Sequence, residues 1–440
     1  MPRIGRRRFL KISGAGTLAA SSGGMAAILA SGKAPAFAQG TTLHWLRWND
    51  FIPQSDTLLR NQIAPQCAKD LGITLTIEMI NGNDIQARTT AAIQSGAGPD
   101  VICALNNWPQ LYANSTVDVS DITEKVGKDQ GGFYDESTAV ANNGKRWLGV
   151  PWCIVGNESA YRKSWFEAVG YNKFPETWDQ YRELGKKLKA KGQPIGQALG
   201  HSFGDPPSFW YPLLWAYGGM EVNKGGKVVL DSKATIESVK FGVAFWKDCC
   251  DDGGLAWDDS SNNRAFLAGT ISSTQNGASI YLVARRDPDK YQDEKGQPLY
   301  KDILHSALPK GPAGKFSYQL PHTNMLMGYS KQQDAARKFL AWVHSKPVYQ
   351  LWFDSQAGYS VGATTAWEND PIWNKDPVMA PFRTVARGAQ FPGYAGPADR
   401  KAAEALSKYI IIDMYAKAVQ GMSAEDAVKW ATGEITKIYT

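Results

Sequence analysis

A five-residue apolar segment, Val101-Ile102-Cys103-Ala104-Leu105, constrains the possible folds more than any other part of the sequence. It follows the turn-forming residues Gly98-Pro99-Asp100, and it contains no polar side chain that could face water. A strand that does not alternate polar and apolar residues is typical of a parallel sheet covered by helices on both faces. The segment therefore predicts an α/β fold with a buried central strand.

Strand and helix patterns alternate along the rest of the chain, which also favours an α/β fold. The residue patterns predict strands at 43–48 and 75–80. Apolar residues at helical spacing predict helices, the clearest of which cover 84–95, 177–192, 241–250, 334–344 and 423–437. Thr177 and Gln180 have the spacing of a capping box, and we expect Asp84 to cap the helix that it begins.

The first 38 residues have the pattern of an export signal. Arg6 and Arg7 precede Phe9-Leu10-Lys11, a mildly apolar run extends from Ile12 to Ala30, and Ala36-Phe37-Ala38 offers a cleavage site. The alternative is a membrane anchor, but the run is rich in Gly, Ser and Ala and is too polar for a stable span. The pattern resembles a twin-arginine signal. We expect cleavage after Ala38 and a mature protein located in the periplasm.

The charge of the mature chain argues against nucleic-acid binding. The whole sequence has 48 basic and 42 acidic residues, a net charge of +6. Six of the basic residues and none of the acidic ones lie in residues 1–38, so cleavage leaves equal numbers of each. Binding to nucleic acid depends on a basic excess that displaces counterions from the phosphates. The mature chain has no such excess.

The sequence contains no short motif of a common enzyme or metal centre. It has no G-x-S-x-G, no Walker A sequence, no H-E-x-x-H and no dinucleotide-binding glycine pattern. The five cysteines form no C-x-x-C pair, and the five histidines are scattered. We therefore expect no metal, no cofactor and cysteines that serve packing, although one disulfide stays possible.

Paired acids are the feature that an enzyme could use. Asp251-Asp252 and Asp258-Asp259 could serve the hydrolysis of a glycosidic bond. Adjacent acids near glycines are more often solvated loop residues, because acid-base catalysis needs a shielded pocket. We expect no enzymatic activity, and an exported glycan-processing hydrolase stays an alternative.

Five groups of motifs, in order along nearly the whole mature chain, resemble the extracellular solute-binding proteins of ABC importers, in the sugar-binding branch that contains maltose-binding protein. The motifs occupy residues 92–101, 150–152 with 161–163, 175–178 with 189–192, 265–270 with 276–277, and the helices at 335–342 and 424–436. Each motif alone is a weak indication of this family, but the presence of all five groups in this order is specific to it.

This resemblance implies a two-lobed periplasmic binding protein fold, with a hinge and a ligand cleft between the lobes. The first lobe would comprise 39–150 and 275–325, and the second 151–274 and 326–440. The protein would bind a solute, as a monomer, and deliver it to the permease subunits of an ABC importer in the inner membrane.

The resemblance also implies which residues contact the ligand. Trp48, Asn49 and Asp50 end the first strand, and Asn107 and Trp108 follow the central strand. The family's other contact positions correspond to Trp152, Phe209, Trp210, Asn276, Ser279, His322 and Tyr359.

These candidates favour a sugar or a related neutral polyol. An aromatic ring can stack on the apolar face of a sugar while amides and carboxylates bind its hydroxyls. The candidates include one acid and no base, whereas a cationic ligand needs several acids and a phosphate needs Arg or Lys. A polyamine, a metal chelate and a phosphorylated polyol stay as alternative ligands of the same fold.

Overall fold

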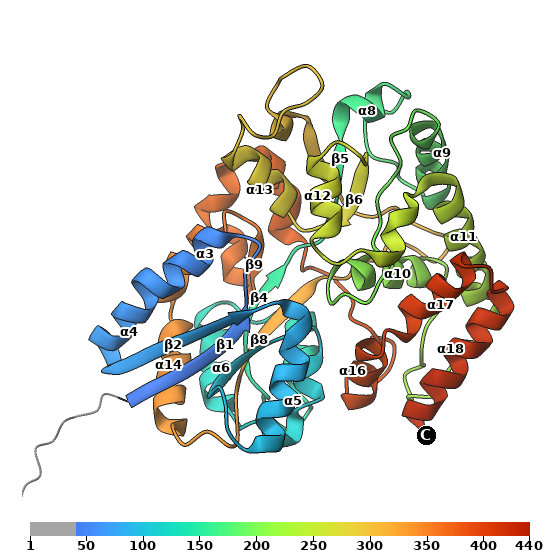
Figure 1. The fold of residues 1–440 in the computed structure, drawn as a ribbon. Coiled ribbons are helices and arrows are strands. Elements are labelled where there is room, and N and C mark those ends of the chain that lie inside the picture. Colours follow the sequence, from blue (N-terminus) through green and yellow to red (C-terminus); the bar gives the residue numbers. More distant parts are fainter. Residues whose placement is uncertain (1–40) are drawn as a thin grey trace, which may run out of the picture. The chain divides into compact units, whose positions relative to one another are not determined.

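The computed structural model describes residues 41–440. The predicted signal, residues 1–38, lies outside the described residues. Residues 43–440 form one compact unit, which contains two β-sheets surrounded by helices (Figure 1). No helix in the described part of the chain combines the length and the apolar character that crossing a membrane requires.

The larger sheet has six strands in the order β2-β1-β3-β8-β4-β9. They are β1 (Thr41–Trp48), β2 (Ile73–Ile80), β3 (Val101–Leu105), β4 (Val150–Val155), β8 (Leu320–Leu326) and β9 (Ser360–Gly362). All five residues of β3 are buried, which confirms the predicted central strand. However, β3 is parallel only to β1 and lies antiparallel to β8. The sheet is mixed because β8 returns to it from a distant part of the sequence.

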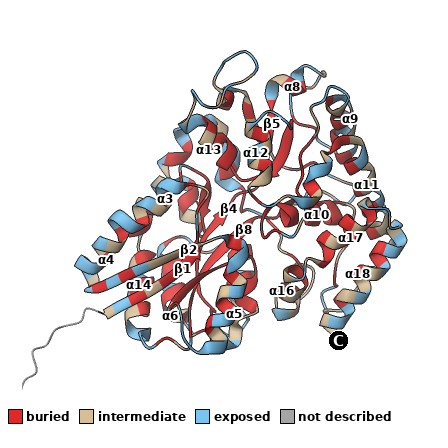
Figure 2. Cartoon of the chain, in the orientation of Figure 1, coloured by how far each residue is buried: buried red, intermediate tan, exposed pale blue. Residues whose placement is uncertain are grey.

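Helices cover this sheet, and we call the sheet and its helices the first lobe. The helices are α3 (Pro53–Leu58), α4 (Ala64–Leu71), α5 (Ile85–Ser95), α6 (Ser120–Asp129), α7 (Asp135–Ala141), α14 (Gln333–Val343) and α15 (Lys346–Ser355). Aromatic side chains join them to the strands: Phe339 of α14 packs against Trp45 of β1 with ring centroids 5.3 Å apart. The buried residues run through the centre of the lobe (Figure 2).

The smaller sheet has three strands in the order β6-β5-β7, and with its helices it forms the second lobe. Its strands are β5 (Glu158–Arg162), β6 (Ser273–Asn276) and β7 (Ile303–Ser306). Its helices are α8 (Lys163–Glu167), α9 (Trp178–Lys189), α10 (Asp205–Ala216), α11 (Lys233–Cys249), α12 (Ser261–Leu267), α13 (Ser279–Arg286), α16 (Arg400–Ser407), α17 (Ile410–Val419) and α18 (Ala424–Tyr439). An aromatic-rich core joins α9, α10, α11 and α17.

The strand pairing differs from the predicted lobe boundaries. The sequence predicts β7 in the first lobe, within 275–325, and the predicted lobe boundary falls inside β6, but both strands pair with β5. β9 and α14 were expected in the second lobe, within 326–440, but β9 pairs with β4 and α14 packs on the first lobe. The sequence of β6, Ser-Thr-Gln-Asn, has no apolar pattern, so its place depends on hydrogen bonds to a partner far away in the sequence.

Several local predictions are confirmed. Thr177 and Gln180 form the capping box that begins α9, and Gly96 ends α5 in a left-handed conformation. Asp84 does not cap α5 through its side chain, because a short 3-10 turn precedes the helix and Asn81 caps that turn instead. All five cysteines are buried and free, as expected of packing residues.

Candidate ligand-binding site

The candidate site lies where strands of the larger sheet end beside the second lobe. Trp48 ends β1, Asn106 and Asn107 follow β3, and His322 lies near the beginning of β8. Pairing of Leu105 with His322 brings the end of β3 to the beginning of β8. Polar side chains from distant parts of the sequence thereby meet at one edge of the sheet, which is where open α/β sheets bind ligands.

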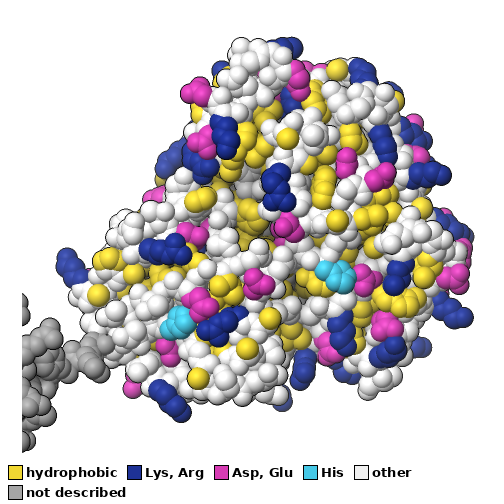
Figure 3. Space-filling model, viewed as in Figure 1, with side chains coloured by type: hydrophobic (Ala, Val, Ile, Leu, Met, Phe, Trp, Pro, Cys, Tyr) yellow, Lys and Arg dark blue, Asp and Glu magenta, His cyan; other side chains and the backbone are white. Residues whose placement is uncertain are grey.

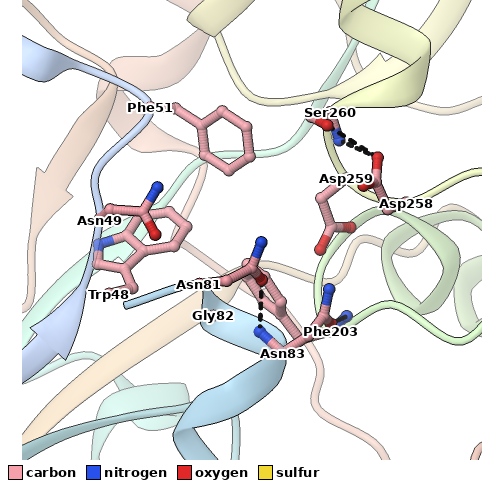
Figure 4. Close-up of a pocket in the computed structure, with 10 residues that line it drawn as sticks. All are labelled: Trp48, Asn49, Phe51, Asn81, Gly82, Asn83, Phe203, Asp258, Asp259 and Ser260. Atoms are coloured by element: carbon pink, nitrogen blue, oxygen red, sulfur yellow. Dashed lines mark hydrogen bonds between the residues drawn. The ribbon is translucent and has the colours of Figure 1, made fainter. Parts of the chain in front are cut away.

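A pocket opens at this edge. It is lined by Trp48, Asn49, Phe51, Asn81, Gly82, Asn83, Phe203, Asp258, Asp259 and Ser260 (Figure 4). The Trp48 ring lies 5.5 Å from the Phe51 ring and 5.7 Å from the Phe203 ring, both edge-on. Trp48 and Asp259 lie on opposite sides of the pocket. The pocket therefore combines aromatic walls with amide and carboxylate groups.

The face that carries this site is hollowed near its centre (Figure 3). Apolar side chains are visible inside the hollow, and acidic and basic side chains lie at its edge. At the rim of the pocket, Asp258 lies 3.7 Å from Arg264. No Lys or Arg is among the described residues that line the pocket. This lining offers no cationic partner to a phosphate group, which disfavours a phosphorylated polyol.

Several buried polar atoms near the site have no hydrogen-bond partner. They include Nε1 of Trp48, both amide atoms of Asn107 and both ring nitrogens of His322, whose ring lies 4.7 Å from that of Trp48. A buried polar group without a partner costs about 1–3 kcal/mol. An ordered water or a polar ligand can satisfy such groups, so these atoms are available for hydrogen bonds at this edge of the sheet.

Burial shapes the charge of the site. Burial raises the pKa of Asp259 to about 6, although hydrogen bonds from Ser202 and the backbone oppose the change. Burial, followed by the carboxylate of Asp259, raises the pKa of Asp205 well above its usual range. Burial, and then the charge of Arg47, lowers the pKa of His322 to about 3. At neutral pH the histidine is therefore an uncharged hydrogen-bonding group.

The structure brings some of the predicted residues to the pocket. Trp48 and Asn49 line it, His322 packs against Trp48, and the ring of Tyr359 lies 6.5 Å from that of Phe51. Asp50 instead turns into the first lobe, where its carboxylate accepts hydrogen bonds from Gln356 and the backbone of Ile52.

Asn276 and Ser279 belong to a small polar cluster around Asn263. The amide of Asn276 donates to Asn263 Oδ1, and Asn263 Nδ2 donates to Ser279 Oγ at 3.0 Å. None of the three is among the residues that line the pocket.

Four aromatic candidates lie in the hydrophobic cores and do not line the pocket. Trp108 is buried in the core of the first lobe, and Trp152 packs there against Tyr349 and Trp352. Phe209 and Trp210 are buried in the core of the second lobe, where Trp210 Nε1 donates to the carbonyl of Ala198. This arrangement gives no support to ligand contacts by these four residues.

The sequence reasoning missed Phe203 and the two amides Asn81 and Asn83. Phe203 follows a Gly-His-Ser stretch that shows no periodicity. The sequence predicts that the paired acids Asp258 and Asp259 are solvated loop residues. Asp258 is exposed as expected, but Asp259 is 6% exposed and lies inside the pocket wall.

In residues 41–440, no cluster of three or more His, Cys, Asp or Glu side chains is arranged to hold a metal ion. The sequence profile of a family described as "Bacterial extracellular solute-binding protein" matches residues 62–381. A binding protein of Brucella abortus is 22% identical over 340 residues, which cover 76% of this chain and 80% of that protein.

Solved structures confirm the predicted two-lobed α/β fold. Maltose-bound MalE3 of T. maritima has a TM-score of 0.75 and 20% identity, covering 90% of this chain and 99% of that one. A solute-binding protein of Agrobacterium radiobacter in complex with ribitol has a TM-score of 0.71 and 20% identity, covering 90% and 98%. A solute-binding protein of Thermotoga lettingae with α-D-tagatose has a TM-score of 0.74 and 18% identity, covering 91% and 100%.

Proposed function

The chain belongs to the family of bacterial extracellular solute-binding proteins, and on this premise we propose that it is the periplasmic component of an ABC importer for a sugar or related polyol. Its relatives are named as binding proteins, among them an ABC transporter-binding protein of Deinococcus radiodurans that is 20% identical. Proteins of this family act outside the cytoplasmic membrane. The groups that line the pocket determine which class of solute the protein binds.

The observation that carries the proposal is the combination of groups around the pocket. Trp48, Phe51 and Phe203 provide aromatic walls, and Asn49 and Asp259 provide polar groups. A sugar or polyol has apolar C–H faces that pack on aromatic rings and hydroxyls that pair with amides and carboxylates. The neighbours with ribitol, α-D-tagatose and maltose support this class of ligand, because they share the fold.

Binding is coupled to closure of the two lobes. Polar contacts already join them: Asn83 Oδ1 accepts from the backbone N–H of Phe203 at 3.2 Å, and Gln86 Nε2 donates to Ser407 Oγ at 2.8 Å. A ligand that contacts both lobes favours the closed state, and hinge closure of this kind shifts a population without any chemical step. The closed form is then the one that the permease receives.

A thermal-shift panel on residues 39–440 tests the proposal. In a panel of ribitol, tagatose and maltose, we expect at least one compound to raise the melting temperature, while amino acids and polyamines at the same concentration leave it unchanged. At a concentration of about 100 times the dissociation constant, a bound solute adds about 2.7 kcal/mol to the free energy of unfolding. Chromatography of the same samples should recover the solute intact. Stabilisation by amines alone, or steady formation of a product, would contradict the proposal.

Export through twin arginines is the second part of the proposal. It rests on Arg6-Arg7 with Phe9-Leu10-Lys11, which lie outside the described residues. Changing both arginines to lysine is expected to keep the precursor in the cytoplasm, because the paired arginines are the part of this signal that directs export. Cell fractionation and immunoblotting measure the effect, and normal export of the lysine variant would refute this part alone.

A further inference from the structure

Phe203 crosses from one lobe into the other. It lies in the loop before α10 of the second lobe, and the nearby residues Leu199 and Phe209 belong to the core of that lobe. The ring of Phe203 instead packs on the first lobe, 5.7 Å from the ring of Trp48 in β1, and it is 4% exposed. The ring therefore forms a pocket wall that the second lobe contributes.

The backbone of Phe203 is held in place from the first lobe. Its N–H donates to Asn83 Oδ1 at 3.2 Å, and its carbonyl accepts from Asn106 Nδ2 at 3.0 Å. Both amides follow strands of the larger sheet, so their positions are fixed by that sheet. While these bonds are made, the ring cannot withdraw from the pocket.

Asp259 holds the same loop from the second lobe. Its carboxylate accepts the backbone N–H of Gly204 at 3.2 Å and that of Asp205 at 2.7 Å. Ser202 Oγ donates to the same carboxylate. These bonds hold the residues on both sides of Phe203 in place. They are charge-assisted, and such bonds are among the stronger hydrogen bonds in proteins.

Gly82 fits against the ring because it has no side chain. A Cβ atom at Gly82 would lie 2.3 Å from Cε1 of Phe203, far inside normal contact distance. The ring therefore fills the space between Gly82 and Trp48 and closes that end of the pocket. On the other side, Asp258 is fixed by hydrogen bonds from the hydroxyls of Ser260 and Ser261, at 2.8 and 2.7 Å.

We propose that Phe203 determines the size of the ligand, so that the pocket accepts one sugar ring or a short open-chain polyol and rejects disaccharides. The ring closes the end of the pocket between Gly82 and Trp48, so a second sugar unit has no room on that side. This inference rests on the proposed function and adds a size class to it.

Titration calorimetry with tagatose, ribitol and maltose tests the proposal on the wild type and on Phe203→Ala. We expect the wild type to bind tagatose or ribitol at least tenfold more tightly than maltose. Removing the ring opens that end of the pocket, so Phe203→Ala should improve maltose binding at least tenfold, about 1.4 kcal/mol. The same change should weaken the single-ring ligand, because one wall is lost.

Two further variants keep the test decisive. Phe203→Leu retains an apolar group against Gly82, and we expect it to shift the ratio of maltose to tagatose affinity in the same direction but less. Phe209→Leu changes a similar ring in the core of the second lobe, and it should leave the ratio unchanged. Circular dichroism establishes that each variant is folded before titration, and Phe203→Leu replaces the alanine variant if that one unfolds.

The outcomes separate this inference from the proposed function. Equal affinity of the wild type for maltose and tagatose would overturn the size limit and leave sugar binding intact. An unchanged affinity ratio in both Phe203 variants would likewise overturn the role of this residue. If no sugar or polyol binds the wild type, the proposed function fails and the size limit fails with it.

Discussion

Replacing Gly82 with alanine is expected to weaken ligand binding at least about tenfold, which corresponds to about 1.4 kcal/mol. The new Cβ would lie 2.3 Å from Phe203 Cε1, so the ring could not reach its place beside Trp48. Gly82 has no positive φ angle, so alanine fits its backbone. Calorimetry measures the affinity, and small-angle scattering with ligand measures the loss of closure.

Two matched variants serve as controls for Gly82→Ala. The double variant Gly82→Ala with Phe203→Ala removes the clash and should recover closure, giving a clear coupling between the two sites. Gly433→Ala lies in α18 with nothing within 4 Å of the new Cβ, and it should leave binding unchanged. Normal affinity and closure of Gly82→Ala would mean that Phe203 does not pack against Gly82 in the liganded protein.

Replacing Trp48 with alanine is expected to lower affinity by about 2 kcal/mol, roughly thirtyfold. Trp48 is the aromatic wall that ends β1, and its loss removes both stacking area and shape from the pocket. The residue is also 2% exposed, so its replacement should destabilise the fold as well. The decisive measurement is therefore calorimetric affinity at a temperature at which circular dichroism shows the variant to be folded.

Trp210→Ala is the matched control, because Trp210 is buried in the second core and bonds to the carbonyl of Ala198. It should lower the free energy of unfolding by about 3–5 kcal/mol and leave the affinity of the folded protein unchanged. If Trp210→Ala loses affinity while Trp48→Ala keeps it, the ligand lies against α10 and the assignment of the pocket is wrong.

The central strand was predictable because its pattern is local. Val101–Leu105 is apolar throughout, and a short segment of that kind is typical of a strand that is buried on both faces of a sheet. Its neighbour β8 was predictable as a strand but not as an antiparallel one, since pairing between residues such as Leu105 and His322 joins distant parts of the sequence. Sheet order of this kind is set by tertiary packing.

The aromatic candidates show why ligand contacts are harder to predict. All residues of α10, including Phe209 and Trp210, are buried, so the helix has no periodic pattern that separates a core face from a pocket face. Trp152 lies in β4, which is also buried throughout. Position at the end of a strand identified Trp48 and Asn49, which line the pocket, but it also identified Asp50 and Trp108, which do not.

Phe203 and Asp259 were not predictable from local sequence. Their roles depend on each other: the carboxylate of Asp259 binds the backbone beside Phe203, and Phe203 then reaches the other lobe. In the sequence, the two residues are separated by α10, α11 and the loop that leads to α12. Only the folded arrangement shows that an apparent surface acid supports a pocket wall.

A crystal structure of residues 39–440 with the solute that gives the largest thermal shift is the most direct test of the central claim. The account predicts a bound solute between Trp48 and Asp259, with its apolar face toward the aromatic rings and its hydroxyls toward the amides of Asn49 and Asn83. A solute found instead in the groove lined by Arg387 and Phe391, with the Trp48 pocket unfilled, would contradict it.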